Sequence, residues 1–208
     1  MRELDPQTTS RAESFNFFSK APMPMVTIFK TLDVTPIFRL SKRGYKFNML
    51  MCYCIGLAAS KIREFKWLPA GDKLLDYDDL GIDIVVANVN GGLNYCDVPF
   101  DGSFQKFNSD YLELTKRVRE SCENHMDAER IIVGTSCVAK YDVDGVVNMC
   151  SGVFNNPFLI WGRCVRRGFF GKSLKLSLQF HHLQMDGEQA CEFLALLQKA
   201  IDELSKEL

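Results

Sequence analysis

Two adjacent histidines, His181 and His182, stand in the stretch HHLQMDG, which also contains Asp186. The chain holds only three histidines, so this stretch concentrates the side chain that is best suited to proton transfer near neutral pH. An imidazole here could act as a general base and take the proton of a hydroxyl group. Taken singly, these residues more often serve as a hydrogen-bonded core histidine and a helix cap. Their combination favours chemistry.

The flanking residues predict the elements that position this stretch. Apolar and polar residues alternate over 174–180, the period-2 pattern of a half-buried strand. Continuing the alternation puts His182 on the apolar face at the end of the strand and His181 on the polar face. After the Asp-Gly pair, apolar residues recur at helical spacing, which predicts a helix over 187–206 with Asp186 at its N-cap. We expect His182 to end the strand and to face a cleft.

The remaining chain mixes helical and strand-like patterns without strict alternation. This mixture predicts an α/β fold, a two-layer sandwich with helices packed on a mixed β-sheet. Within the stretch 103–125 the candidate inward positions are Phe107, Leu112, Leu114 and Val118. The expected helices are 11–19, one starting at Thr35–Pro36, about 46–63 and 103–125, and the expected strands are 25–35, 130–143, 146–154 and 158–167, with a hairpin within 74–90.

Length and composition predict a single domain over residues 1–208, because no Gly/Ser run, Pro-rich stretch or block of like charge suggests a linker. A net charge of −1 gives no electrostatic argument for a nucleic acid partner. No stretch has the apolar length of a signal peptide or a membrane span. Several of the eight cysteines lie in apolar runs, so we expect reduced thiols and a cytoplasmic protein. Without a Cys-x-x-Cys pair and with few histidines, no metal site is predicted.

The stretch HHLQMDG resembles the His-His-x-x-x-Asp-Gly signature of the chloramphenicol acetyltransferase family, whose relatives include dihydrolipoyl acyltransferase cores and peptide-synthetase condensation domains. Four other stretches are similar to family segments in the same order. SRAESFNFF is similar to the start of the family's first helix, and KFNMLMCYCIGLAASKIREFKWL is similar to its long helix. GTSCVAKYDV stands where the family has Ser-x-x-Pro-Trp, and NNPFLIWGRC is similar to its Pro-x-x-Thr-x-Gly stretch. The likeness covers nearly the whole chain, and the histidine motif is its most specific part.

The resemblance implies an enzyme that moves an acetyl group directly from acetyl-coenzyme A to a hydroxyl group of a small molecule. Chloramphenicol or a related alcohol would be the acceptor, and antibiotic resistance the role. His182 matches the general base, and Ser136 matches the serine that hydrogen-bonds the oxyanion. Asp186 and Arg11 match a pair that holds the site in shape. The family assembles as a homotrimer with each site at a subunit boundary, the histidine coming from one subunit and the serine from the other.

Two departures from the family pattern bear on activity. The Pro-Trp of the serine stretch is replaced by Ala139-Lys140, which alters the backbone beside Ser136. The threonine of Pro-x-x-Thr-x-Gly is matched by Ile160, which cannot supply the same hydrogen bond. These departures keep a second interpretation open, in which the chain is a catalytically degenerate member of the fold that binds a small ligand or serves in assembly.

Two further groups of residues are assigned on weaker grounds. Aromatic and apolar residues that could line the acceptor pocket are Phe29, Phe38 and Ile160, although such residues more often belong to the core. Basic residues that could meet the phosphates of coenzyme A are Arg163, Arg166, Arg167 and Lys172, although a stretch of this kind is usually a solvated turn.

Overall fold

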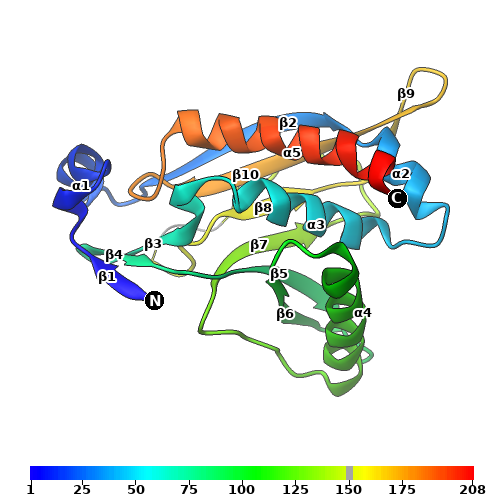
Figure 1. The fold of residues 1–208 in the computed structure, drawn as a ribbon, viewed down its shortest axis with the longest axis horizontal. Coiled ribbons are helices and arrows are strands. Elements are labelled where there is room, and N and C mark those ends of the chain that lie inside the picture. The colour runs from blue at the N-terminus through cyan, green and yellow to red at the C-terminus, as the bar shows by residue number, and fades with distance from the viewer. Residues whose placement is uncertain (149–151) are drawn as a thin grey trace.

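The computed structural model describes residues 1–148 and 152–208, which form one large mixed sheet, one small sheet and helices gathered on one side (Figure 1). The large sheet has the strand order β2 (Met25–Asp33), β10 (Gly171–His181), β8 (Phe158–Trp161), β7 (Ile131–Cys137), β5 (Leu80–Ala87) and β6 (Leu93–Phe100), and β9 (Val165–Arg167) pairs with the start of β10. The small sheet has the order β1 (Arg2–Leu4), β4 (Lys73–Asp76) and β3 (Trp67–Ala70). Strand β7 runs parallel to β5 and β8, and the other neighbours are antiparallel.

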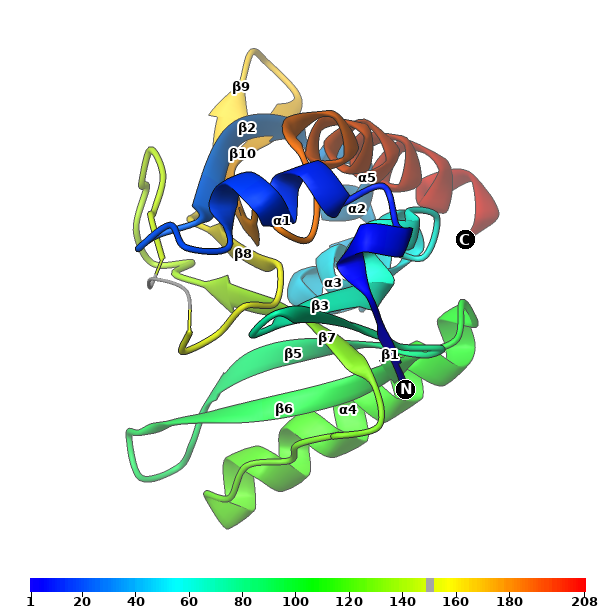
Figure 2. The ribbon, with the colours of Figure 1, turned by 90° about the vertical axis from the view of Figure 1, so that its left-hand side faces the viewer.

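One face of the large sheet is covered by α2 (Thr35–Ser41), α3 (Phe47–Ala59), α4 (Phe104–Ser121) and α5 (Gly187–Glu207). The first helix, α1 (Ala12–Phe18), lies at the end of the sheet instead, and 3₁₀ turns are found at Pro6–Thr8 and Arg63–Lys66. Helices α3 and α5 lie side by side over the sheet, and α4 covers its β5–β6 end (Figures 1 and 2). Because sheet and helices surround α3, nearly every one of its residues is buried and apolar.

The alternation of side chains along each strand gives the sheet two different faces. Ile84, Val133, Leu159 and Leu178 point to the helices and form the core. The residues between them on the strands point to the other face, which we call the open face. At one end of the sheet, where β10 finishes, lies α1 (Figure 1). This arrangement leaves two places for chemistry: the end of β10 and the open face.

The predicted fold class is confirmed, and α5 covers the predicted helix 187–206. The predicted long helix is shorter, because its backbone tightens into i→i−3 hydrogen bonds at Lys61 and Ile62. That turn brings Phe65 into the core, where its ring stacks on Phe193 at a centroid distance of 4.6 Å.

The predicted hairpin within 74–90 is wrong. Strands β4 and β5 do lie there, but they belong to different sheets: β4 pairs with β3 and β1, and β5 pairs with β6. Each strand takes the neighbour on its other side in the sequence. Turn residues between two apolar runs fix a change of direction, but they do not fix which strands pair.

Other boundaries also differ from expectation. The stretch 158–167 divides into β8 and β9, and residues 146–148 and 152–154 form no strand, whereas 149–151 lie outside the described residues. On α4, Phe107 and Val118 are buried as predicted, but Leu112 is exposed. The other buried residues of that helix are Tyr111 and Thr115. Among the described residues, no helix has the length and apolar character needed to cross a bilayer.

Candidate active site

His182 lies just beyond the end of β10. The strand ends at His181, one residue earlier than predicted, although the His182 N–H still donates to the carbonyl oxygen of Pro24 at 2.7 Å. The His182 ring stacks on Phe18 of α1, with centroids 4.4 Å apart and planes 24° apart. The side chain is 30% exposed, yet its Nδ1 is buried. The edge of the ring that carries Nε2 is therefore the one that faces outward.

Asp186 supplies a fixed negative charge beside this ring. Its Oδ1 lies 3.2 Å from His182 Nδ1, at an angle that does not make a hydrogen bond. Hydrogen bonds from Arg11 hold the pKa of Asp186 below its ordinary value, so the carboxylate stays ionised. A carboxylate on the Nδ1 side favours the tautomer with the proton on Nδ1. Nε2 is then free to accept a proton.

Arg11 binds the whole turn that contains these two residues. Its Nη1 donates to Asp186 Oδ2 at 2.5 Å, and its Nη2 donates to Oδ1 at 2.8 Å, a bidentate pair. Its guanidinium also donates to the carbonyl oxygens of His182 at 2.7 Å and Leu183 at 3.2 Å. Arg11 is only 2% exposed, so this first-helix arginine is part of the interior. It connects α1 to the turn between β10 and α5.

His181 is the more buried of the two histidines, at 4% exposure. Its Nδ1 accepts a hydrogen bond from the N–H of Leu183 at 3.1 Å. Burial, with a smaller contribution from the neighbouring His182, lowers the pKa of His181 to about 4. His181 is therefore neutral near pH 7 and shapes the turn, whereas strand alternation alone had placed it on a polar face.

Ser136 lies on the open face of the sheet, at one end of a row of residues. Ser136 is in register with Ile160, Ile160 with Ser177, and Ser177 with Phe29, so the row crosses four strands. Three of the residues predicted for the site share this row: Ser136, Ile160 and Phe29. Phe29 is half-exposed and packs against Gly145, where a Cβ would come within 2.2 Å of its ring.

Ser136 and His182 are far apart within one chain. Ser177 stands two strands away from Ser136 in the row, and His182 follows it by five residues. Strand rise and spacing therefore separate the Cα atoms of Ser136 and His182 by about 19 Å. An oxyanion donor has to lie within hydrogen-bond distance of the reacting oxygen. The two side chains cannot act on the same substrate within one copy of the chain.

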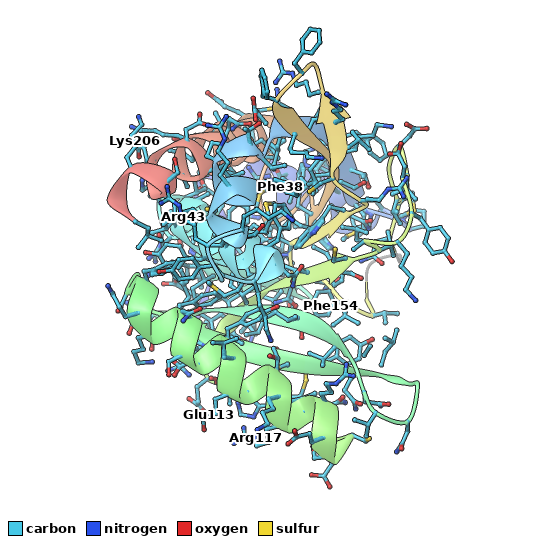
Figure 3. The ribbon with its side chains drawn as sticks, turned by 90° about the vertical axis from the view of Figure 1, so that its right-hand side faces the viewer. Phe38, Arg43, Glu113, Arg117, Phe154 and Lys206 are labelled. Atoms are coloured by element: carbon cyan, nitrogen blue, oxygen red, sulfur yellow. The ribbon has the colours of Figure 1, made fainter. Side chains whose placement is uncertain are left out.

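A cavity of about 720 Å³ is hollowed into the open face beside Ser136. Its lining includes Ile160, Phe158 and Phe154, and it also includes the carboxylates Asp83 and Asp97. Figure 3 shows Phe154 beyond β7, on the side of the sheet that the helices leave free. The volume and the mostly apolar lining are those of a small-molecule site.

Phe38 does not reach this cavity. It lies on α2, with Lys42 Nζ and Lys172 Nζ at 5.0 and 4.8 Å from its ring centroid (Figure 3). Cation–π contacts and the edge of Phe47 account for its environment. The structure therefore separates Phe38 from Phe29 and Ile160.

The basic residues proposed for coenzyme A are spread along the β9–β10 hairpin. Arg166 donates to the carbonyl oxygens of Gly168 and Phe169, and Arg167 pairs with Asp33 at 3.2 Å. Arg163 follows β8, close to the row of Ser136, and its side chain forms no ion pair within the part of the chain that is described. Lys172 precedes His182 by ten residues of extended chain, about 33 Å. Of these residues, Arg163 lies nearest to the cavity.

No family model matches the chain. Among solved structures, it is similar to a chloramphenicol acetyltransferase, at 20% identity and a TM-score of 0.78, over 95% of this chain and 98% of that one. The chain has the chloramphenicol acetyltransferase fold. A second structure with this fold is a probable dihydrolipoamide acetyltransferase from Listeria monocytogenes, at 16% identity and a TM-score of 0.73, over 96% of this chain and 94% of that one. A third is a truncated catalytic core of the 2-oxoacid dehydrogenase multienzyme complex from Thermoplasma acidophilum, at 18% identity and a TM-score of 0.69, over 93% of this chain and 95% of that one.

A curated relative is the mitochondrial dihydrolipoyllysine-residue acetyltransferase component of the pyruvate dehydrogenase complex of Saccharomyces cerevisiae, which is 22% identical over 180 residues. The match covers 77% of this chain and 36% of the relative, so the chain spans about a third of that protein's length. These comparisons place the chain among structures of one acyltransferase fold, described both as chloramphenicol and as dihydrolipoamide acetyltransferases.

Reasoning from sequence missed two features of these sites. Phe18, the stacking partner of His182, lies in the stretch SRAESFNFF, but nothing in that stretch marks it as a contact of the base. The facing carboxylates Asp83 and Asp97 were also missed. Here a signal existed, because Asp83 interrupts the apolar run GIDIVVA, and a charge inside a buried strand needs a reason.

Proposed function

We propose that the protein is an acetyl-coenzyme A-dependent O-acetyltransferase in which His182 is the general base. The observation that carries this proposal is the geometry of His182: an outward Nε2, a buried Nδ1 and an ionised Asp186 at 3.2 Å. Such an imidazole is oriented to accept a proton at one nitrogen only. The shared fold with acetyltransferases supports the same class of reaction.

The proposed reaction is direct transfer. The hydroxyl proton of the acceptor moves to His182 Nε2 while the oxygen attacks the thioester carbonyl carbon. The tetrahedral oxyanion accepts a hydrogen bond from the Ser136 hydroxyl. When the intermediate collapses, the carbon–sulfur bond breaks, and the departing thiolate takes the proton back from the imidazolium. Because both substrates share one cleft, proximity lowers the barrier and no acetyl-enzyme is needed.

The site is proposed to form between two copies of the chain. The separation of about 19 Å between Ser136 and His182 within one copy supports this arrangement. A homotrimer would bring the His182 of each copy to the open face of its neighbour and make three equal sites. Arg163 follows Ile160 of the Ser136 row by three residues, and a guanidinium in this part of the chain would suit a phosphate of coenzyme A.

One experiment distinguishes two possible acceptors from a third possibility, a protein without turnover. Chloramphenicol or a related alcohol, with a role in antibiotic resistance, is our first proposal. The names of the similar proteins also support a dihydrolipoyl thiol as acceptor. Ile160, an apolar residue in the row of Ser136, is consistent with a third possibility, a catalytically degenerate member that binds a small ligand or assembles without turnover.

The test is formation of free coenzyme A from acetyl-coenzyme A, separated by chromatography, in the presence of chloramphenicol, a panel of small alcohols, or dihydrolipoamide. Chromatography is needed because transfer to dihydrolipoamide leaves the total number of thiols unchanged. We expect turnover with at least one alcohol, and a loss of about 10²- to 10⁴-fold for His182→Ala. Turnover with dihydrolipoamide alone would replace the hydroxyl acceptor by a thiol. If no acceptor supports thiol release, the degenerate interpretation is correct.

A further inference from the structure

Two buried carboxylates face each other in the cavity beside Ser136. Asp83 on β5 and Asp97 on β6 are directly opposite in register, and they are 3% and 1% exposed. Both line the cavity of about 720 Å³. Like charges directly opposite on neighbouring strands destabilise a sheet, and burying a carboxylate costs further free energy. The proposed chemistry at His182 and Ser136 does not use either residue.

The pair is incompletely satisfied by the protein. Asp83 Oδ1 accepts from the N–H of Cys96 at 3.1 Å, and Asp97 Oδ2 accepts from the N–H of Asp127 at 2.6 Å. Asp97 Oδ1 is buried and accepts no hydrogen bond from a nitrogen of the described residues; the polar group that it faces is the carboxyl group of Asp83. Arg130 is a cation in the lining of the same cavity, but its guanidinium is bound to Asp127. Within the described chain, no lysine or arginine forms an ion pair with Asp83 or Asp97.

The charge state of the pair follows from its surroundings. Burial is the largest cause that raises the pKa of each carboxyl group, and the neighbouring charge of Asp97 helps to raise the pKa of Asp83 to about 7. Asp83 is therefore partly protonated near neutral pH, and the pair keeps negative charge. In this apolar cavity no lysine or arginine of the described residues pairs with that charge, although His125 lies close enough to favour it.

The position of the pair relates it to Ser136. Asp83 is in register with Gly134, and Ser136 is two residues further along the same strand, with its side chain on the same face. The Cα atoms of Asp83 and Ser136 are thus about 8 Å apart. A molecule that places a hydroxyl group at Ser136 can place a second group at the carboxylates a few carbon atoms away. Tyr77, Phe154 and Phe158 offer apolar surface for the rest of it.

We propose that this cavity binds a protonated amine at the Asp83–Asp97 pair, so that the acceptor class is an amphiphilic amino alcohol. The ammonium group donates to Asp97 Oδ1, gives the buried charge its missing counter-ion and orients the molecule in the cavity. The presence of a hydroxyl group in the ligand rests on the proposed function, whereas the binding of the amine does not. A neutral alcohol of the same shape leaves the charge unpaired and binds more weakly.

The test compares two probes by isothermal titration calorimetry on the assembled protein without acetyl-coenzyme A. The probes are 2-amino-3-phenylpropan-1-ol, which carries an ammonium group, and 3-phenylpropan-1-ol, which lacks it. The wild type is expected to bind the amine about tenfold more tightly or better. Asp97→Asn keeps the shape of the side chain and removes its charge, so the preference should fall to about twofold or less. Asp83→Asn provides a second, independent variant.

Glu113→Gln is the matched control, because it removes one carboxylate from the exposed side of α4, away from the cavity (Figure 3). It should keep the wild-type preference. Equal affinity of the wild type for the two probes would overturn the inference, even if neither carboxylate variant folds. A preference that survives in Asp97→Asn and Asp83→Asn would overturn it as well. Selective amine binding without any acetyl transfer would contradict only the proposed function.

Discussion

Nδ1 of His182 lies 3.2 Å from Oδ1 of Asp186, a carboxylate whose two oxygens are both bound by Arg11. The arginine thus fixes the charge that selects the histidine tautomer, although Arg11 itself does not touch the ring's outward nitrogen. The residue that holds both His182 and Asp186 in place is therefore the N-cap of α1, more than 160 residues before them in the chain.

The two histidines are expected to respond differently to substitution. His182→Ala removes the base and should lower kcat by about 10²- to 10⁴-fold. His181→Ala should keep most of kcat but lower the melting temperature, because His181 is buried and its Nδ1 satisfies the N–H of Leu183. Steady-state kinetics and thermal melts of the two variants, side by side, are the measurement. A larger loss of kcat at His181 would reverse the assignment.

The Arg11–Asp186 pair is expected to stabilise the fold as well as the site. Asp186→Ala leaves a buried guanidinium without its carboxylate and should lower the free energy of unfolding by about 2–4 kcal/mol. This is below the largest values for buried pairs, because Asp186 is 44% exposed. Denaturant titration measures it. Asp186→Asn, which keeps an acceptor oxygen, should lose less stability. Unchanged stability in both variants would show that the pair does not stabilise the fold.

Sharing of the site between copies predicts complementation. Ser136→Ala alone should lower kcat by about 10²- to 10³-fold, and the His182→Ala protein should also be nearly inactive. Every mixed trimer of the two variants contains one boundary where an intact His182 meets an intact Ser136. Co-expression in equal amounts should therefore restore about a quarter of wild-type activity. Activity that stays at the level of the separate variants would contradict a site that is shared between copies.

Stability should depend on pH through Asp83. Burial and the charge of Asp97 raise its folded-state pKa to about 7, above the 3.8 of an unperturbed aspartate, so the folded state holds a proton that the unfolded chain has lost. The contribution is complete below about pH 4 and is lost as the pH rises through about 7. Thermal melts from pH 5 to 8.5 should show a steeper decline for wild type than for Asp83→Asn. Parallel curves would mean that Asp83 titrates normally.

Local chemistry was predictable from the sequence, and long-range contacts were predictable only in part. The motif around His182 and Asp186 is contiguous, so its spacing indicated both a strand end and a helix start. Arg11 could be assigned only through a resemblance, because nothing local connects it to a turn so distant in the chain. Strand alternation gave the face of His181 but not its burial, since the pattern does not reveal what covers that face.

The pairing between strands was the feature that the sequence predicted least well. The β4–β5 hairpin was expected from turn residues, whereas the neighbours of each strand are chosen by the packing of the whole sheet. For the same reason the sequence could not predict that Asp83 and Asp97 face each other. Each is one acidic residue in its own strand, and only the register of β5 and β6 makes them a pair. Phe38 failed as a pocket residue because an aromatic residue on a helix has the same pattern whether it lines a cavity or packs beside lysines.

The pairing of β2 with β10 has a consequence for synthesis. Among the described strands of the large sheet, β2 pairs with β10 alone, and the two strands lie about 140 residues apart in the chain. On a ribosome that adds about 5–20 residues per second, β10 is made roughly 7 to 28 seconds after β2. During that time its backbone N–H and C=O groups are unpaired and can bind another nascent chain. Contacts of such long range also slow folding in the test tube. The turn that carries His182 is thus completed only after β10 has been made, and the yield of active protein depends on protecting β2 until then.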